Sequence, residues 1–234
     1  LLCGSMLMAQ TPANRTAKTT AADVLAQMPA AKQAAYNKLI GDLSSTGEEG
    51  VLMLVNMINA PGKGSNANVD YALSGLTHYV MAKGEENARL VTAKAYLKAL
   101  EMVNERETKA FIIRQLQMLG KDECIDVLAS YLNDESLSGP AARALASNGS
   151  QKAGQALVAA LKSRTGSSKT QKDVIRAITD ARVDGAEPVL LVLQGASDPN
   201  MQKEVLYALS CVGSSNSLPV LAKELNILMK MHKH

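Results

Sequence analysis

The sequence predicts an all-α fold, and more specifically an α-solenoid of stacked antiparallel helix pairs. Three observations predict it: a repeat with a period near 30 residues, two apolar helical runs in each period, and a composition rich in helix formers. Over residues 108–226, aligning four segments on their apolar residues places Leu116, Leu145, Ile178 and Leu209 at equivalent positions, 29, 33 and 31 residues apart. We expect these four side chains to be buried.

A turn and a second apolar run follow each of these segments. The second runs are centred on Leu128, Leu157, Leu190 and Leu221. Glycine ends three of the four first helices, at Gly120, Gly149 and Gly213, where a left-handed residue with φ > 0 commonly closes a helix. The third repeat has Arg182 at that position and Gly185 three residues later, which predicts a longer turn.

The helices that precede these repeats are less regular. We predict helices at 21–28, at 30–44 with Pro29 in the first turn, at 47–60, at 66–83 closed by Gly84, and from Glu85 to Asn104. Tyr71-Ala-Leu-Ser-Gly-Leu76 nearly repeats Tyr207-Ala-Leu-Ser-Cys-Val212. We therefore interpret residues 21–105 as divergent N-terminal helical repeats and residues 106–234 as the regular array.

Residues 1–9 are uncharged and mostly apolar, which is typical of the end of a secretory signal peptide. Cleavage after Ala9 predicts an exported protein, located in the periplasm, on the outer surface or outside a Gram-negative cell. Two alternatives stay open, namely lipidation at Cys3 and a buried N-terminal helix. Residues 10–20 are predicted to be a disordered lead-in. The basic start of a signal peptide and a polar capping repeat at the C-terminal end are both missing, so we expect the sequence to be part of a longer protein.

Composition narrows the classes of partner. The net charge is +3, with 25 basic and 22 acidic residues, and the chain has one Phe, six Tyr and no Trp. A basic stripe and aromatic platforms are typical of nucleic-acid binding, so no nucleic-acid partner is expected. No segment beyond residues 1–9 has the length and apolarity of a membrane span.

The paired helical runs, the Ala-Leu core pairs and the glycine between helices resemble HEAT repeats in their short form, over about residues 108–226. The resemblance departs from the family pattern at Gln115, where alanine is usual, and in the third turn. It implies an α-solenoid that binds other proteins, with the second helix of each pair on the concave face.

An exported start followed by such an array also resembles secreted bacterial proteins in which HEAT repeats precede a 3-keto-disaccharide hydrolase domain. That domain is absent from this sequence, so no catalytic residue is carried over. The leading hypothesis is a non-catalytic scaffold or protein-interaction module. The alternative is the accessory repeat region of a secreted carbohydrate-active enzyme, and a weaker one is a HEAT-like nucleic-acid enzyme. The partner is then another protein or a covalently linked downstream domain.

The second helices carry the candidate partner surface. If Leu128 and its equivalents face the core, helical spacing turns three rows of side chains outward. The middle row is Ser130, Ala159, Val192 and Lys223, and Lys162 belongs to the row beside it. Small and apolar side chains with a polar rim suit a partner's helix or loop, although an ordinary solvated face has the same pattern.

The first helices carry a second repeated position, occupied by Arg114, Arg143, Arg176 and Tyr207. It is either a patch for an acidic partner or an exposed rim whose aliphatic stems cover apolar neighbours. We favour the rim, because only three charges are involved and carboxylates are abundant.

No motif indicates catalysis, a metal or a cofactor. His232-x-His234 lacks a third ligand, and His78 has no neighbouring Cys or paired carboxylate in sequence. Cys124 and Cys211 are interpreted as small buried hydrophobes too distant for a disulfide. Methionines such as Met57 and Met118 are predicted to fill gaps in the core.

Overall fold

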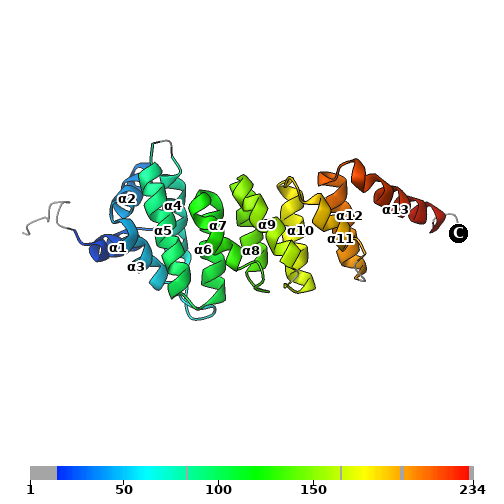
Figure 1. Ribbon diagram of the computed structural model, residues 1–234. Coiled ribbons are helices and arrows are strands. Elements are labelled where there is room, and N and C mark those ends of the chain that lie inside the picture. The colour runs from blue at the N-terminus through cyan, green and yellow to red at the C-terminus, as the bar shows by residue number, and fades with distance from the viewer. Residues whose placement is uncertain (1–14, 83, 164, 196–197, 232–234) are drawn as a thin grey trace, which may run out of the picture. The chain divides into compact units, whose positions relative to one another are not determined.

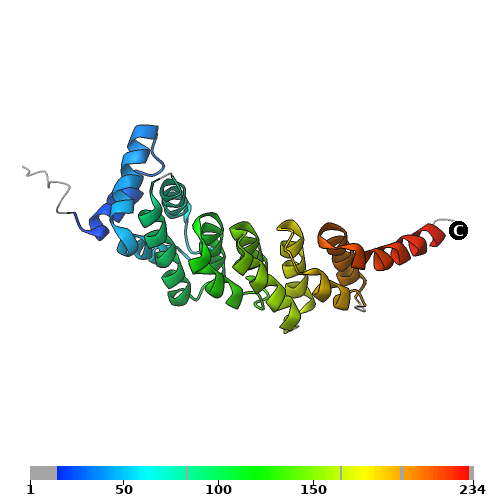
Figure 2. The ribbon, with the colours of Figure 1, turned by 45° about the horizontal axis from the view of Figure 1, so that its top comes forward.

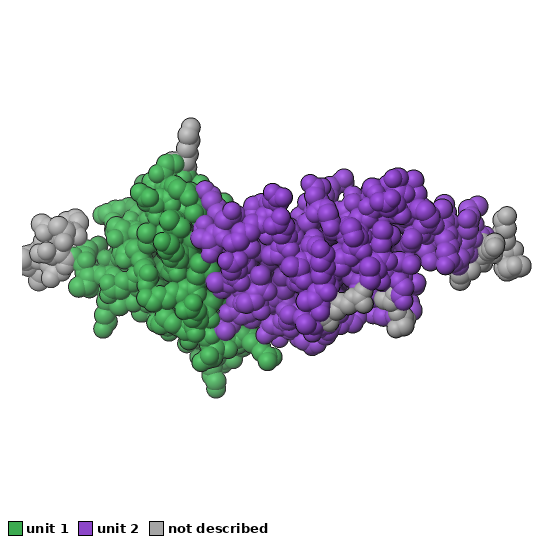
Figure 3. Space-filling model, in the orientation of Figure 1, with its two compact units in different colours: residues 1–108 green, residues 109–234 purple. Residues whose placement is uncertain are grey.

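The computed structural model describes residues 15–82, 84–163, 165–195 and 198–231, and in these residues the secondary structure is entirely helical. The chain divides into two compact units, residues 1–108 and 109–234 (Figure 3). The helices of the first unit are α1 (Ala17–Ala26), α2 (Gln33–Ser45), α3 (Gly47–Asn56), α4 (Ala67–Val80) and α5 (Glu86–Met102). Helix α6 (Arg106–Leu119) begins in the first unit and continues into the second.

The second unit continues with α-helices and short 3-10 helices. Its elements are η2 (Asp122–Cys124), α7 (Ile125–Ser130), α8 (Ser138–Asn148), α9 (Gln151–Ser163), α10 (Ser168–Asp180), α11 (Glu187–Leu193), α12 (Pro199–Val212), η3 (Ser215–Ser217) and α13 (Leu218–Met231) (Figure 1). The predicted all-α class is therefore confirmed. The predicted signal-peptide remnant and most of the lead-in lie outside the described residues.

The first unit packs its helices around a core that includes one buried polar network. Helix α3 packs against α1 and α5, and α2 packs against α4. The hydroxyl of Tyr96 on α5 donates to the Leu73 carbonyl oxygen at 3.2 Å and lies 3.1 Å from the Thr77 hydroxyl. Full burial raises the pKa of Tyr96 well above its ordinary value. This network satisfies the one polar group that the large Tyr96 ring takes into the core.

Several boundaries in the first unit differ from the prediction. Helix α1 begins at Ala17, because the Thr16 side chain caps it by accepting from the Thr19 backbone N–H at 3.2 Å. Residues 17–20 are thus helical rather than part of a lead-in. Pro29 lies in the connection before α2 instead of in its first turn. Helix α3 ends at Asn56, and Met57, which follows it, is exposed, so its predicted place in the core is wrong. Met118 on α6 is exposed as well.

In the second unit, helices of the same kind pack side by side. The first helices α8, α10 and α12 contact one another in succession, and so do the second helices α7, α9 and α11 (Figures 1 and 2). The Gln117 side-chain N–H on α6 donates to the Ser147 hydroxyl on α8 at 3.0 Å. Consecutive helix pairs therefore stack in chain order, as in a solenoid.

The repeated core positions are confirmed. Leu116, Leu145, Ile178 and Leu209 are all at most 1% exposed, and Leu128, Leu157 and Leu190 are buried on the second helices. Leu221 is only half-buried. The reason is that the described part of α13 packs closely only against α12 and η3. Gln115, the departure from the family pattern, is buried in the core.

The turns between paired helices correct the prediction about glycine. Only Gly149 has the expected left-handed backbone, with φ of 70°. Gly213 is extended, with φ of −74°; a Cβ there would lie 2.3 Å from the Leu209 carbonyl oxygen. At Gly120 a Cβ would similarly meet the Leu116 carbonyl oxygen at 2.6 Å. These two glycines are needed because a 3-10 turn folds back onto the end of the helix.

In the third repeat the left-handed position is occupied by Arg182, with φ of 49°. The Val183 backbone N–H donates to the Ile178 carbonyl oxygen at 3.0 Å, the bond of a Schellman helix end. A side chain in this conformation is strained by about 1–2 kcal/mol. The turn also continues to Gly185, which is left-handed, so the longer turn that the sequence predicted is present.

Candidate partner-binding surface

The side chains predicted to face outward from the second helices are exposed. Ser130, Ala159, Lys162, Val192 and Lys223 are all accessible to solvent, and Val192 is 63% exposed. Helix α9 contacts both α7 and α11, so the structure brings Ser130, Ala159 and Val192 onto neighbouring helices. Lys223 lies on α13, whose close packing is with α12 and η3. The outward direction is therefore confirmed, whereas partner binding stays a prediction.

Polar side chains tie the rim of this surface together. The Asn133 side-chain N–H donates to the Thr165 hydroxyl at 3.0 Å, across one repeat. The Ser130 hydroxyl donates to the Val127 carbonyl oxygen at 2.7 Å, so part of its hydrogen-bonding capacity is used within its own helix. Ser130 is polar and hydrogen-bonded within its own helix, and Lys223 is charged. Ala159 and Val192 are therefore the residues of the row that expose apolar surface to a partner.

The repeated position on the first helices forms an exposed rim. Arg114, Arg143, Arg176 and Tyr207 are all exposed. The Arg176 Nε–H donates to the Glu204 carboxylate on the next first helix at 2.9 Å, and this hydrogen bond raises the pKa of Arg176. Arg176 therefore links α10 to α12, which agrees with the rim interpretation and reduces the charge left for an acidic partner.

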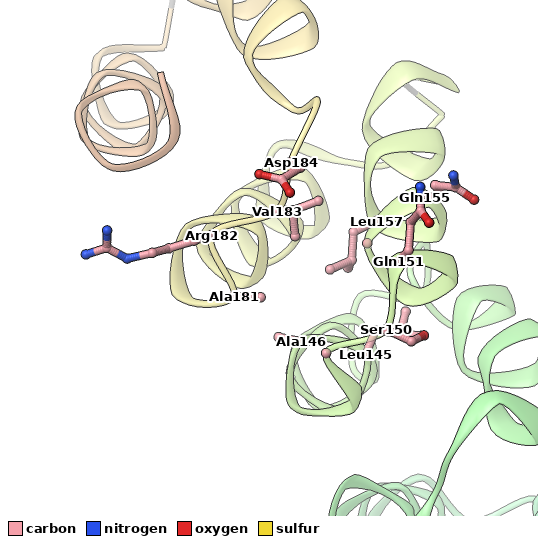
Figure 4. A pocket seen from close by; sticks show the side chains of 12 residues that line it. Leu145, Ala146, Ser150, Gln151, Gln155, Leu157, Ala181, Arg182, Val183 and Asp184 are labelled. Carbon is pink, nitrogen blue, oxygen red and sulfur yellow. The ribbon is translucent and has the colours of Figure 1, made fainter. Parts of the chain in front are cut away.

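A cleft of about 560 Å³ opens between the α8–α9 turn and the α10–α11 turn (Figure 4). Its polar walls are formed by Gln151 and Gln155 on α9 and by Asp184 in the α10–α11 turn, and Leu157 and Val183 supply apolar surface. Its volume is within the range of known ligand sites. Sequence analysis missed it, although Gly154 and Gly185 stand where the neighbouring repeats carry side chains.

The first unit carries an exposed aromatic cluster that sequence analysis also missed. The rings of Tyr36 on α2 and Tyr71 on α4 meet edge-on, with centroids 5.6 Å apart. A Cβ at Gly75 would lie 2.4 Å from the Tyr36 hydroxyl, so glycine leaves the space in which Tyr36 lies. Burial, and then the neighbouring Tyr71, raise the pKa of Tyr36. The low number of aromatics had concealed that two of them meet across one pair of helices.

Within the described residues, no group of three His, Cys, Asp or Glu side chains could hold a metal ion. His78 is exposed, and His232 and His234 lie outside those residues. Cys124 is buried and Cys211 is half-buried, and neither of these two cysteines forms a disulfide. None of the helices that the structure describes combines the length and the apolarity needed to cross a membrane.

No protein-family model matches the chain, and no curated protein matches it. Among solved structures it is similar to the crystal structure of an engineered protein, at 21% identity and a TM-score of 0.42. That match covers 82% of this chain and 96% of the engineered one.

Proposed function

We propose that this chain is an exported, non-catalytic module of HEAT repeats that binds a partner protein through its second helices. The observation that carries the proposal is the exposure of Val192, an apolar side chain that lies one helix away from the small, exposed Ala159. Small side chains let a partner helix or loop approach closely, and an apolar centre loses water on contact. Lys162, exposed on α9, belongs to the polar rim.

Rigid helices suit this role. Ser130, Ala159 and Val192 lie on α7, α9 and α11, and each of these helices is anchored by a buried leucine. The surface is therefore set before a partner arrives, which lowers the entropy that binding must overcome. Export is proposed from the apolar residues 1–9 alone.

The test begins by identifying the partner through contact at the proposed surface. A photo-crosslinking residue is placed at Val192 on the second helix α11. The control places it at Arg143, which is also exposed but lies on the first helix α8. Proteins linked from position 192 and not from position 143 are identified by mass spectrometry. Their affinity for the purified chain is then measured by calorimetry.

The double variant Ala159→Glu/Val192→Glu should bind that partner at least about tenfold more weakly, because it places two charges in the apolar centre of the contact. Both side chains are exposed, so the melting curve should not change. Arg143→Glu is the matched control and should leave the affinity unaltered. Equal affinities for the double variant and the wild type would contradict the proposal.

A further inference from the structure

Consecutive repeats of the second unit meet at three junctions, where the second helices begin. The first junction, between α7 and α9, is bridged by Lys152, whose Nζ lies 3.2 Å from the Asp126 carboxylate. Lys152 stands five residues before Leu157, and Asp126 stands two residues before Leu128. A basic side chain from one repeat thus reaches an acceptor on the repeat before it.

The third junction, between α11 and the α12–α13 turn, is closed by Glu187. Its carboxylate accepts from the Ser214 backbone N–H at 2.7 Å, from the Ser214 hydroxyl at 2.8 Å and from the Ser217 hydroxyl at 2.6 Å. Glu187 stands three residues before Leu190. Here the bridge is an acidic side chain that reaches forward to the next repeat.

The second junction has neither bridge, and this is where the cleft lies. Gly154 occupies the position of Glu187, three residues before Leu157, and Gly185 occupies the position of Lys152, five residues before Leu190. In the part of the chain that the structure describes, no hydrogen bond or ion pair joins the α8–α9 turn to the α10–α11 turn. A Cβ at Gly154 would lie 3.0 Å from the Val183 side chain, whereas one at Gly185 would meet nothing within 4 Å. The cleft therefore lies at the junction that no side chain bridges.

The polar groups of the cleft include acceptors that suit a cation. Gln151 and Gln155 lie one helical turn apart on α9, with Asp184 on the opposite wall, and the Arg182 side chain extends away from the glutamines (Figure 4). Among the described residues, the side chains of Gln151, Gln155 and Asp184 have no internal hydrogen-bond partner. Asp184 is the acidic residue among those that line the cleft, and it stands on the wall opposite the glutamines.

We propose that this cleft binds an arginine side chain presented by an extended segment of the partner protein. The Asp184 carboxylate and the two glutamine carbonyl oxygens can together accept the several N–H donors that a planar guanidinium presents. Leu157 and Val183 would cover the aliphatic stem. The bound arginine would supply in trans the basic bridge that Lys152 provides in cis at the first junction.

The proposal rests on the proposed function, because it takes the ligand to be part of a protein partner. It is nevertheless tested without that partner. The probes are capped tripeptides of the form Ala-Xaa-Ala, with Arg, Lys, Glu or Leu in the centre. They are titrated into the ¹⁵N-labelled protein, and the reporters are the side-chain amides of Gln151 and Gln155 and the backbone amides of Gly154 and Gly185.

The arginine peptide should shift these four sets of signals with a dissociation constant in roughly the millimolar range, as a contact of this size allows. Asp184→Lys should weaken the binding at least about tenfold. The matched control is Asp180→Lys, the same change at an exposed aspartate on α10 outside the cleft, and it should have no effect. Gln155→Glu adds a carboxylate to the wall and should tighten the binding.

Three results would overturn the assignment: no shift at these amides, an equal response to the glutamate peptide, or equal effects of the two aspartate variants. These outcomes are separate from the fate of the second-helix surface. If the cleft fails while Val192 still contacts a partner, the proposed function stands without the arginine site. If Ala159→Glu/Val192→Glu changes nothing while the arginine peptide binds, the cleft is a site but the row is not.

Discussion

The second and third junctions of the repeat array have the same helices and the same period but different chemistry between them. At the third junction a carboxylate and two serines close the space, and the turn after α12 folds tightly back onto its helix. At the second junction glycine replaces the bridging side chains, and a cleft of about 560 Å³ remains. The comparison teaches that a repeat can keep its core while the edge between repeats is closed or open according to one or two residues.

The largest expected effect is a loss of stability on replacing Gly213, compared with Gly149, which occupies the equivalent position in its repeat. In Gly213→Ala the new Cβ would meet the Leu209 carbonyl oxygen at 2.3 Å, so the closed turn has to move, at a cost of about 3 kcal/mol. In Gly149→Ala the Cβ points into open space, and only the left-handed backbone opposes it, at about 1–2 kcal/mol. Urea unfolding of both variants measures the difference. A smaller loss for Gly213→Ala than for Gly149→Ala would contradict the close approach of the Leu209 carbonyl oxygen to Gly213.

A smaller effect is expected at the open junction from Arg182→Gly. Relief of the left-handed strain exceeds the extra entropy that glycine has in the unfolded chain, so the variant should be more stable by about 0.5–1 kcal/mol. The unfolding midpoint in urea is the measurement. Arg114→Gly, within α6, is the control and should lose about 1 kcal/mol, because there the backbone is helical. If both variants lose stability, Arg182 makes a contribution that outweighs its strain.

The smallest effect concerns pH at the closed junction. The hydrogen bond from Ser217, followed by those from Ser214, lowers the pKa of Glu187 in the folded state. Its stabilising contribution is therefore fully present above the unfolded value of about 4.3 and is lost as the pH falls through the lower folded pKa. Glu187→Gln should lower the melting temperature at pH 7, and the gap to the wild type should shrink below about pH 4.

Asp126→Asn at the first junction is the control for that measurement. Its pair with Lys152 is largely exposed to solvent, so little change in melting temperature is expected at either pH. A pH-independent gap between Glu187→Gln and the wild type would show that the carboxyl group contributes through shape alone.

How much was predictable depended on whether a residue's role is set by its position in the repeat. Leu116 and its three equivalents are buried as the period predicted, and Val192 is exposed as helical spacing predicted. The roles of the turn glycines were not predictable in the same way, because one sequence signal, a glycine after the helix, has two physical causes. Gly149 provides a left-handed backbone, whereas Gly213 provides room for a carbonyl oxygen.

The exposed aromatic cluster shows a further limit of the sequence. The composition shows only that Tyr36 and Tyr71 are two of a small number of aromatic residues. Folding brings their ring centroids to 5.6 Å from each other on neighbouring helices. The cleft has the same origin. It is lined by the α8–α9 turn with α9 and by the α10–α11 turn, which lie about one repeat apart in the sequence and come together only on folding.

The sequence by itself determined that this chain is helical, that its helices are paired with a period near 30 residues, and that Leu116, Leu145, Ile178 and Leu209 are buried. Apolar spacing along one helix is a local property, and burial of that side is the dominant gain in folding. The tertiary structure alone decided which junctions close. That outcome depends on whether side chains from two repeats come within hydrogen-bonding distance. The sequence of a single repeat does not determine this distance.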